Sequence, residues 1–101
     1  MIEVDVNALD EAMAAGASVI DVREADEFAQ VRVPGATLLP LSEFVARMDE
    51  LPDVETLYLI CAVGGRSLQA AQFLNARGIN AVSVAGGTDA WLHSGKAVER
   101  G

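Results

Sequence analysis

The feature that most constrains the fold is a regular alternation of short apolar runs with segments of helical periodicity. The runs at 18–22, 57–60 and 81–84 have the length and composition of buried strands. The segments between them carry the spacing and the end signals of helices. Strands separated by helices of this length favour an α/β fold in which helices cover both faces of a mainly parallel sheet.

Cap and turn residues set the bounds of the first expected helices. Asn7 is a suitable N-cap for a helix that runs through residue 15 and is closed by Gly16. Residues 24–30 are predicted to form a second, short helix, and a turn at 34–35 precedes an apolar stretch over 36–39.

A third helix is expected between Ser42, as its N-cap, and Pro52, which marks its end. Apolar residues at helical spacing support it: Leu41, Phe44, Val45 and Met48. A further helix is predicted over 67–77, and a last short helix contains Trp91, which is expected in the core. The tail over 94–101 is expected to be ordered only in part.

The only cysteine, Cys61, stands where the apolar run 57–60 ends and a glycine-rich turn opens the next helix. Gly64 and Gly65 let the backbone curl, so the amides of the turn should converge in front of the sulfur. The positive end of the helix and the charge of Arg66 act in the same direction. These features favour a thiolate, which predicts a nucleophile. The alternative for a free cysteine is a small buried hydrophobe.

Several expected strand ends carry polar residues. In a parallel sheet, functional sites lie beyond the carboxyl ends of the strands. Cys61, the segment 21–24 and the segment 85–87 all occupy such ends, so three loops are expected to meet around one pocket. Asp21 is predicted to be a buried carboxylate that bonds the cysteine loop or pairs with Arg23, in a supporting role.

Size and charge exclude several classes of protein. A chain of 101 residues that is 51% hydrophobic is expected to form one globular domain over 1–101. Fifteen acidic against seven basic residues give a net charge of −8, which disfavours nucleic acid and anionic membranes as partners. No apolar run approaches a membrane span and the first residues do not resemble a signal peptide, so the expected compartment is the cytoplasm.

The single cysteine and the acidic charge also constrain the chemistry. One cysteine cannot form an internal disulfide, which fits a reducing compartment, and covalent sulfur chemistry must finish on another molecule. An anionic substrate would need a local positive site, for which Arg23, Arg32 and Arg66 are candidates unless they form salt bridges or surface contacts. His93 is expected at the surface, and no metal site is expected.

Four segments, in order along nearly the whole chain, resemble the rhodanese domain family. Residues 61–67, Cys-Ala-Val-Gly-Gly-Arg-Ser, resemble its active-site loop Cys-x-x-Gly-x-Arg-Ser. Residues 21–24 resemble its Asp-x-Arg segment, residues 33–36 its Ile-Pro-Gly-Ala turn, and residues 86–91 its Gly-Gly-x-x-Ala-Trp close. The resemblance implies the three-layer rhodanese fold, a five-stranded mainly parallel sheet with helices on both faces, and persulfide chemistry at Cys61.

Two places depart from the family pattern. Val31 and Arg32 stand where the family usually has Gly-His, so a change in local packing or in the pocket rim is expected, without loss of activity. The family's closing Gly-x-Pro-Val is replaced at 95–98 by Gly-Lys-Ala-Val, which bears on how firmly the tail is held.

The resemblance implies a sulfurtransferase that works in two halves without a metal or organic cofactor. Cys61 takes the outer sulfur of thiosulfate or of a persulfide, and a thiophilic acceptor such as cyanide or a thiol removes it. The residues expected to bind the substrate are Ala62, Val63, Gly64, Gly65, Arg66 and Ser67. Ser67 has the alternative role of a helix cap. Because Ala62 and Val63 are uncharged, we expect weak thiosulfate turnover and better persulfide transfer, including from a protein donor.

Other functions of this fold stay open at the level of sequence. Phosphatases of the same fold place one residue more between Cys and Arg, whereas four residues separate Cys61 from Arg66, and the shorter ring suits a single sulfur. Arsenate reduction also uses one thiolate and an external thiol, and nothing favours it over sulfur transfer. A sulfur relay or a docking module would keep the same cysteine loop.

Overall fold

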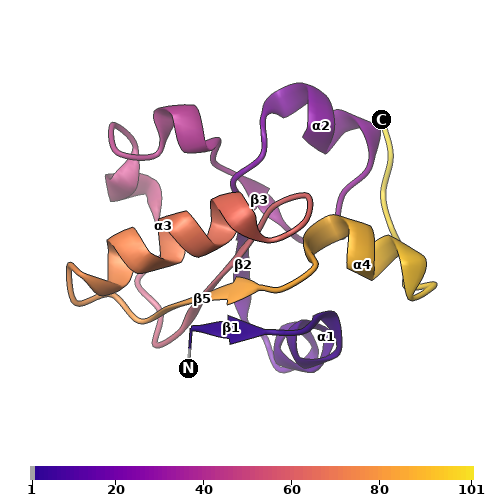
Figure 1. Ribbon diagram of the computed structural model, residues 1–101, viewed down its shortest axis with the longest axis horizontal. Coiled ribbons are helices and arrows are strands. Elements are labelled where there is room, and N and C mark those ends of the chain that lie inside the picture. The colour runs from indigo at the N-terminus through magenta and orange to yellow at the C-terminus, as the bar shows by residue number, and fades with distance from the viewer. Residues whose placement is uncertain (1) are drawn as a thin grey trace.

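The structure, a computed structural model, describes residues 2–101 and is an α/β fold built on one sheet (Figure 1). Within these residues five strands lie in the order β1-β5-β4-β2-β3. They are β1 (Glu3–Val4), β2 (Ser18–Asp21), β3 (Thr37–Leu38), β4 (Leu57–Ile60) and β5 (Ala81–Val84). All pairings between neighbouring strands are parallel, so the predicted α/β class and five-stranded sheet are confirmed.

Helices connect the strands and cover both faces of the sheet. They are α1 (Val6–Ala14), α2 (Ala25–Gln30), α3 (Gly65–Asn75) and α4 (Gly87–His93), with short 3₁₀ helices η1 (Leu41–Glu43) and η2 (Met48–Glu50). Successive side chains of β4 point to opposite faces. Leu59 packs with Leu74 of α3 on one face, whereas Ile60 packs with Leu9 of α1 and Trp91 of α4 on the other. Trp91 therefore lies in the core, as predicted.

The first helix begins earlier than predicted. The carboxylate of Asp5 accepts a hydrogen bond from the amide of Ala8 at 2.9 Å, so Asp5 is the N-cap and the helix starts at Val6. Asn7, the predicted cap, lies inside the first turn. An N-cap side chain must reach the third residue of the helix, and Asp5 has that spacing to Ala8.

The helix predicted between Ser42 and Pro52 is wrong. This segment contains only η1 and η2 joined by turns, and the hydroxyl of Ser42 donates to the carboxylate of Glu24 at 3.0 Å instead of capping a helix. The apolar spacing does not mark one buried face, because Phe44 is buried whereas Val45 is 69% exposed.

The C-terminal tail is held more firmly than predicted. Arg32 and Glu99 form an antiparallel bridge in which each backbone amide donates to the other residue's carbonyl, at 2.9 and 3.0 Å. The indole nitrogen of Trp91 donates to the carbonyl of Ala97 at 2.8 Å. Figure 1 shows the yellow C-terminal segment returning beside α2. Arg32, a position that departs from the family pattern, is thus a packing contact for the tail.

The strands β2, β4 and β5 end at one edge of the sheet. Asp21 lies opposite Ile60, and Leu59 lies opposite Ser83 in the parallel register. The segments that follow these strands therefore emerge close together, as the sequence predicts. No helix among residues 2–101 is long and apolar enough to cross a membrane.

Candidate functional site

The loop after β4 wraps backbone amides around the sulfur of Cys61. The amide of Gly64 donates to Cys61 Sγ at 3.1 Å, and the amide of Ser67, in the first turn of α3, donates at 3.3 Å. Gly64 has a φ of 118°, a left-handed conformation that favours glycine. The predicted convergence of amides on the sulfur is confirmed.

Cys61 is buried, yet its surroundings are not those of an inert apolar thiol. Cys61 is 1% exposed, and this burial raises the pKa of its thiol. The hydroxyl and amide of Ser67 and the amides of Gly64 and Val63 lower the pKa, and the net result is a pKa below the ordinary value for cysteine. The site therefore gives Cys61 a larger share of thiolate, the nucleophilic form, than an ordinary cysteine has.

Two buried hydroxyl groups extend from the sulfur into the core. Ser67 Oγ lies 3.3 Å from Cys61 Sγ and 2.8 Å from the hydroxyl of Ser83 in β5. Ser67 Oγ also donates to the carbonyl of Gly64 at 3.2 Å. Ser67 and Ser83 are fully buried. The sequence reasoning missed Ser83, although it is the one polar residue in an otherwise apolar strand, which is a usable signal.

The start of α4 holds the other side of the cysteine loop. The amide and the hydroxyl of Thr88 both donate to the carbonyl of Cys61, at 2.8 and 3.0 Å, and the amide of Asp89 donates to the carbonyl of Ala62 at 3.0 Å. A Cβ on Gly87 would clash with both of these carbonyls. The segments after β4 and β5 thus meet as predicted, and Thr88 is a contact that the sequence reasoning missed.

Asp21 and Arg23 form a buried ion pair at the end of β2. The carboxylate of Asp21 accepts hydrogen bonds from Arg23 Nε at 3.0 Å and from Arg23 Nη2 at 2.8 Å. Arg23 also donates to the carbonyls of Glu27 and Val31, at 3.3 and 2.7 Å, and this joins β2 to α2. The predicted pairing is confirmed, and the guanidinium of Arg23 is turned to the protein interior, where the residue is 4% exposed.

Arg66 has a carboxylate partner that the sequence reasoning did not predict. Its guanidinium makes a two-pronged ion pair with Glu27 of α2, with N–O distances of 2.7 and 2.9 Å. The Arg66 hydrogen bonds lower the pKa of Glu27 from 4.5 to about 2, and Glu27 in turn raises the pKa of Arg66. Arg32 is likewise paired, with Glu99 at 3.5 Å. Arg23, Arg32 and Arg66, the three arginines that the sequence offered as cations for an anionic substrate, therefore all have acidic partners.

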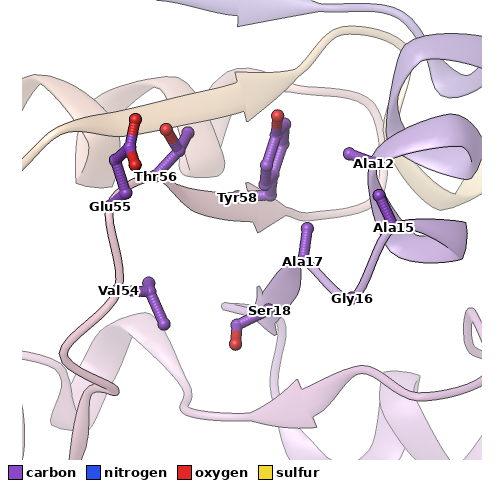
Figure 2. A pocket seen from close by; sticks show the side chains of 9 residues that line it. All are labelled: Ala12, Ala15, Gly16, Ala17, Ser18, Val54, Glu55, Thr56 and Tyr58. Carbon is purple, nitrogen blue, oxygen red and sulfur yellow. The ribbon is translucent and has the colours of Figure 1, made fainter.

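Away from the cysteine loop, the structure shows an open hollow and an exposed histidine. An open hollow of about 440 Å³ lies at the opposite edge of the sheet, where β2 and β4 begin, and Figure 2 shows the side chains that line it. Its lining residues are Ala12, Ala15, Gly16, Ala17, Ser18, Val54, Glu55, Thr56 and Tyr58. His93 is exposed, and its ring lies 2.7 Å from the carbonyl of Asp89. Across residues 2–101 no group of three or more His, Cys, Asp and Glu side chains is arranged to hold a metal ion.

Comparisons with known proteins agree with one another on the family of this chain. A family model described as a rhodanese-like domain matches residues 5–94. A sulfurtransferase of Allochromatium vinosum is 33% identical over 92% of this chain and 90% of its own length. The thiosulfate sulfurtransferase GlpE of Actinobacillus pleuropneumoniae is 34% identical over 83% of this chain and 79% of its own.

Other relatives are longer proteins or solved structures. The putative sulfur carrier protein YrkF of Bacillus subtilis is 35% identical over 64% of this chain, which spans only 35% of that protein. The crystal structure of a rhodanese-related protein from Thermoplasma volcanium superposes with a TM-score of 0.90 at 31% identity, over 98% of both chains.

Proposed function

This chain belongs to the rhodanese-like domain family, and on that premise we propose that it is a sulfurtransferase that carries a sulfane sulfur on Cys61. The observation that carries the proposal is the set of hydrogen bonds to the sulfur: two backbone amides, of Gly64 and Ser67, and the neighbouring hydroxyl of Ser67. Donors placed in this way stabilise a negative sulfur before any substrate arrives.

The proposed reaction has two balanced halves. The thiolate of Cys61 forms a bond to the outer sulfur of the donor, and the bond between that sulfur and the rest of the donor breaks. The departing sulfite or thiolate keeps the electron pair. In the second half, cyanide or a thiolate attacks the outer sulfur of the persulfide, and Cys61 leaves as a thiolate, ready for another cycle.

The loop residues have distinct roles in this proposal. Backbone amides from Ala62 to Ser67 hold the anionic terminal sulfur, and the Ser67 hydroxyl supports the inner sulfur. The ion pair of Asp21 and Arg23 fixes the end of β2 and supports the site without contacting the reacting atoms. No cofactor is needed, because the electrons that form each S–S bond come from a sulfur atom of the reactants.

We propose persulfides, either small or on a protein donor, as better sulfur donors than thiosulfate. Thiosulfate is a dianion, and a chain of net charge −8 repels it unless a local cation compensates. Arg66 is the cation of the cysteine loop, and Glu27 already neutralises it through two hydrogen bonds. A persulfide presents its outer sulfur without an attached sulfonate group, so it depends less on a free cation.

A sulfur relay is the second candidate function, because a relative named as a putative sulfur carrier protein matches this chain. A phosphatase role is not supported by the position of Arg66, since a phosphate would need both prongs of a guanidinium that Glu27 holds. A reducing compartment such as the cytoplasm suits either sulfur role, because thiols that discharge a persulfide are available there.

A steady-state comparison of donors tests this proposal. We expect thiocyanate to form from cyanide with a low-molecular-weight persulfide, more slowly with thiosulfate, and not at all with the Cys61→Ser variant. Loading without repeated turnover would favour the relay. Thiocyanate formation that is clearly faster with thiosulfate would contradict the donor preference, and hydrolysis of an aryl phosphate without sulfur transfer would contradict the whole proposal.

A further inference from the structure

The hydroxyl of Ser83 has one hydrogen-bond partner in the part of the chain that the structure describes, and that partner is Ser67 Oγ at 2.8 Å. Ser83 is fully buried, and a buried hydroxyl hydrogen without an acceptor is costly. Ser83 must therefore donate its hydrogen to Ser67. The hydroxyl of Ser67 accepts that hydrogen and keeps its own hydrogen for a second partner.

Ser67 has two acceptors for its own hydrogen, the Gly64 carbonyl at 3.2 Å and Cys61 Sγ at 3.3 Å. When Cys61 is a thiol, its S–H group donates to Ser67, and Ser67 donates to Gly64. When the thiol ionises, the S–H bond breaks and the proton passes to water or buffer. The Ser67 hydrogen then turns to the negative sulfur, while Ser83 still donates to Ser67.

We propose that Ser83 is a positioning residue that acts through Ser67 to favour the thiolate of Cys61. The hydrogen bond from Ser83 matters more in the thiolate state than in the thiol state. Without Ser83, the thiol state still satisfies the Ser67 oxygen, because the S–H group donates to it. The thiolate state has no S–H group, so the Ser67 oxygen then lacks a donor and its own hydrogen bond to the sulfur is weaker.

A change at Ser83 removes none of the charged residues of the elements at this edge. These are the Asp21–Arg23 pair at the end of β2, Glu27 on α2, Arg66 on α3 and Asp89 on α4. None of them bonds the hydroxyl of Ser83. A change in thiolate formation in a Ser83 variant therefore reports on the hydroxyl chain rather than on the charges.

The test is the pH dependence of Cys61 alkylation by iodoacetamide in the intact chain. Cys61 is the only cysteine, so the rate reports on one thiol. We expect Ser83→Ala to move the profile to higher pH and to slow alkylation at neutral pH roughly threefold, the size expected for one weakened hydrogen bond. Ser18→Ala, the same change at the start of β2, is the matched control and should leave the profile unchanged.

A double variant separates action through Ser67 from an independent effect. Ser67→Ala should shift the profile further than Ser83→Ala, and adding Ser83→Ala to it should change nothing more. Shifts that add in the double variant, or a Ser83→Ala profile that superposes on the wild type, would overturn the inference. Ser83→Thr keeps the hydroxyl and should restore the wild-type profile; a profile equal to that of Ser83→Ala would also overturn it.

This inference takes from the proposed function only that Cys61 acts as a thiolate. Alkylation needs no sulfur donor or acceptor, so its outcome is independent of sulfur transfer. If the chain proves not to transfer sulfur but Ser83→Ala still shifts the alkylation profile, the proposed function fails and the positioning role stands.

Discussion

At the scale of single residues, the site stabilises a negative sulfur with hydrogen bonds and leaves little free positive charge. Gly64 and Ser67 bring donors to within 3.1–3.3 Å of Cys61 Sγ, whereas Arg66 is bound to Glu27. In the function that we propose, these hydrogen bonds act on the attacking sulfur, whereas a free arginine would act on the charge of the donor. The proposed site therefore activates the cysteine without selecting for dianionic donors.

Replacing Glu27 tests whether its carboxylate neutralises the charge of Arg66. Glu27→Gln keeps an oxygen that accepts from the amide of Glu24 but removes the charge that neutralises Arg66. We expect kcat/KM for thiosulfate to rise about tenfold, the effect of about 1.4 kcal/mol of added attraction, with little change for a persulfide donor. The measurement is steady-state thiocyanate formation with each donor.

Glu43→Gln is the matched control for this change. It also removes one carboxylate from an ion pair, since Glu43 bonds Arg47 at 2.7 Å, but that pair lies on η1 and the following turn. An equal gain with thiosulfate in both variants would show that overall charge, and not the release of Arg66, controls the donor preference.

Much of the residue-scale site could be predicted, because its parts follow one another in the chain. The Cys61 loop and the Asp21–Arg23 pair are local in sequence. Glu27, Ser83 and Thr88 were not predicted, because each reaches the site only through the order in which the strands pair. The sequence marks Ser83 as the one polar residue of an apolar strand, but it does not show that Ser83, Glu27 or Thr88 lies at the cysteine loop.

At the scale of elements, the two loops that follow β4 and β5 are locked together by close backbone contact. The first turn of α4 donates three hydrogen bonds to the carbonyls of Cys61 and Ala62. This approach is possible only because Gly87 has no side chain at the point where the loops touch. The donors around the sulfur are therefore fixed by a second element and not by the cysteine loop alone.

A change at Gly87 should uncouple these elements. Gly87→Ala places a Cβ against the carbonyls of Cys61 and Ala62, and we expect loss of sulfur loading together with destabilisation by at least ~2 kcal/mol, since backbone must move. Urea unfolding and persulfide loading measure the two effects.

Gly95→Ala is the control that separates the clash from backbone strain. Gly87 and Gly95 both have left-handed backbone, with φ of 57° and 80°, but a Cβ on Gly95 would meet open space. It should cost about 1–2 kcal/mol and leave loading intact. Equal effects of the two substitutions would show that the contact with the cysteine loop has no special role.

Some elements were predicted with the correct bounds, and one predicted helix does not exist. The strands at 57–60 and 81–84 match their predicted bounds, since short apolar runs between turn residues leave few alternatives. The helix predicted between Ser42 and Pro52 was wrong. The side chain of Phe44 is buried, and the amide of Leu41 donates to the carbonyl of Val22 at 2.9 Å; these two contacts hold the segment in short turns. Helical spacing alone does not reveal such contacts.

At the scale of the whole molecule, the sheet is covered by α3 on one face and by α1 and α4 on the other (Figure 1). Both apolar clusters include residues of the central strand β4. Disruption of either face therefore disturbs the same strand, which ends directly at Cys61.

This shared strand predicts that the chain of 101 residues unfolds as a single unit. We expect one cooperative transition in urea, with the fluorescence of Trp91, which reports on the α4 face, coinciding with circular dichroism, which reports on all helices. Separate midpoints for the two signals would contradict a single folding unit over 1–101.

The central claim, a transferable sulfur on Cys61, is tested most directly by intact-protein mass spectrometry. The protein is treated with thiosulfate or with a low-molecular-weight persulfide, and then with cyanide, alongside the Cys61→Ser variant. We predict that the wild-type chain gains the mass of one sulfur atom, that cyanide removes it as thiocyanate, and that the variant gains nothing. The absence of an added sulfur with either donor, or an adduct that forms without Cys61, would contradict the account.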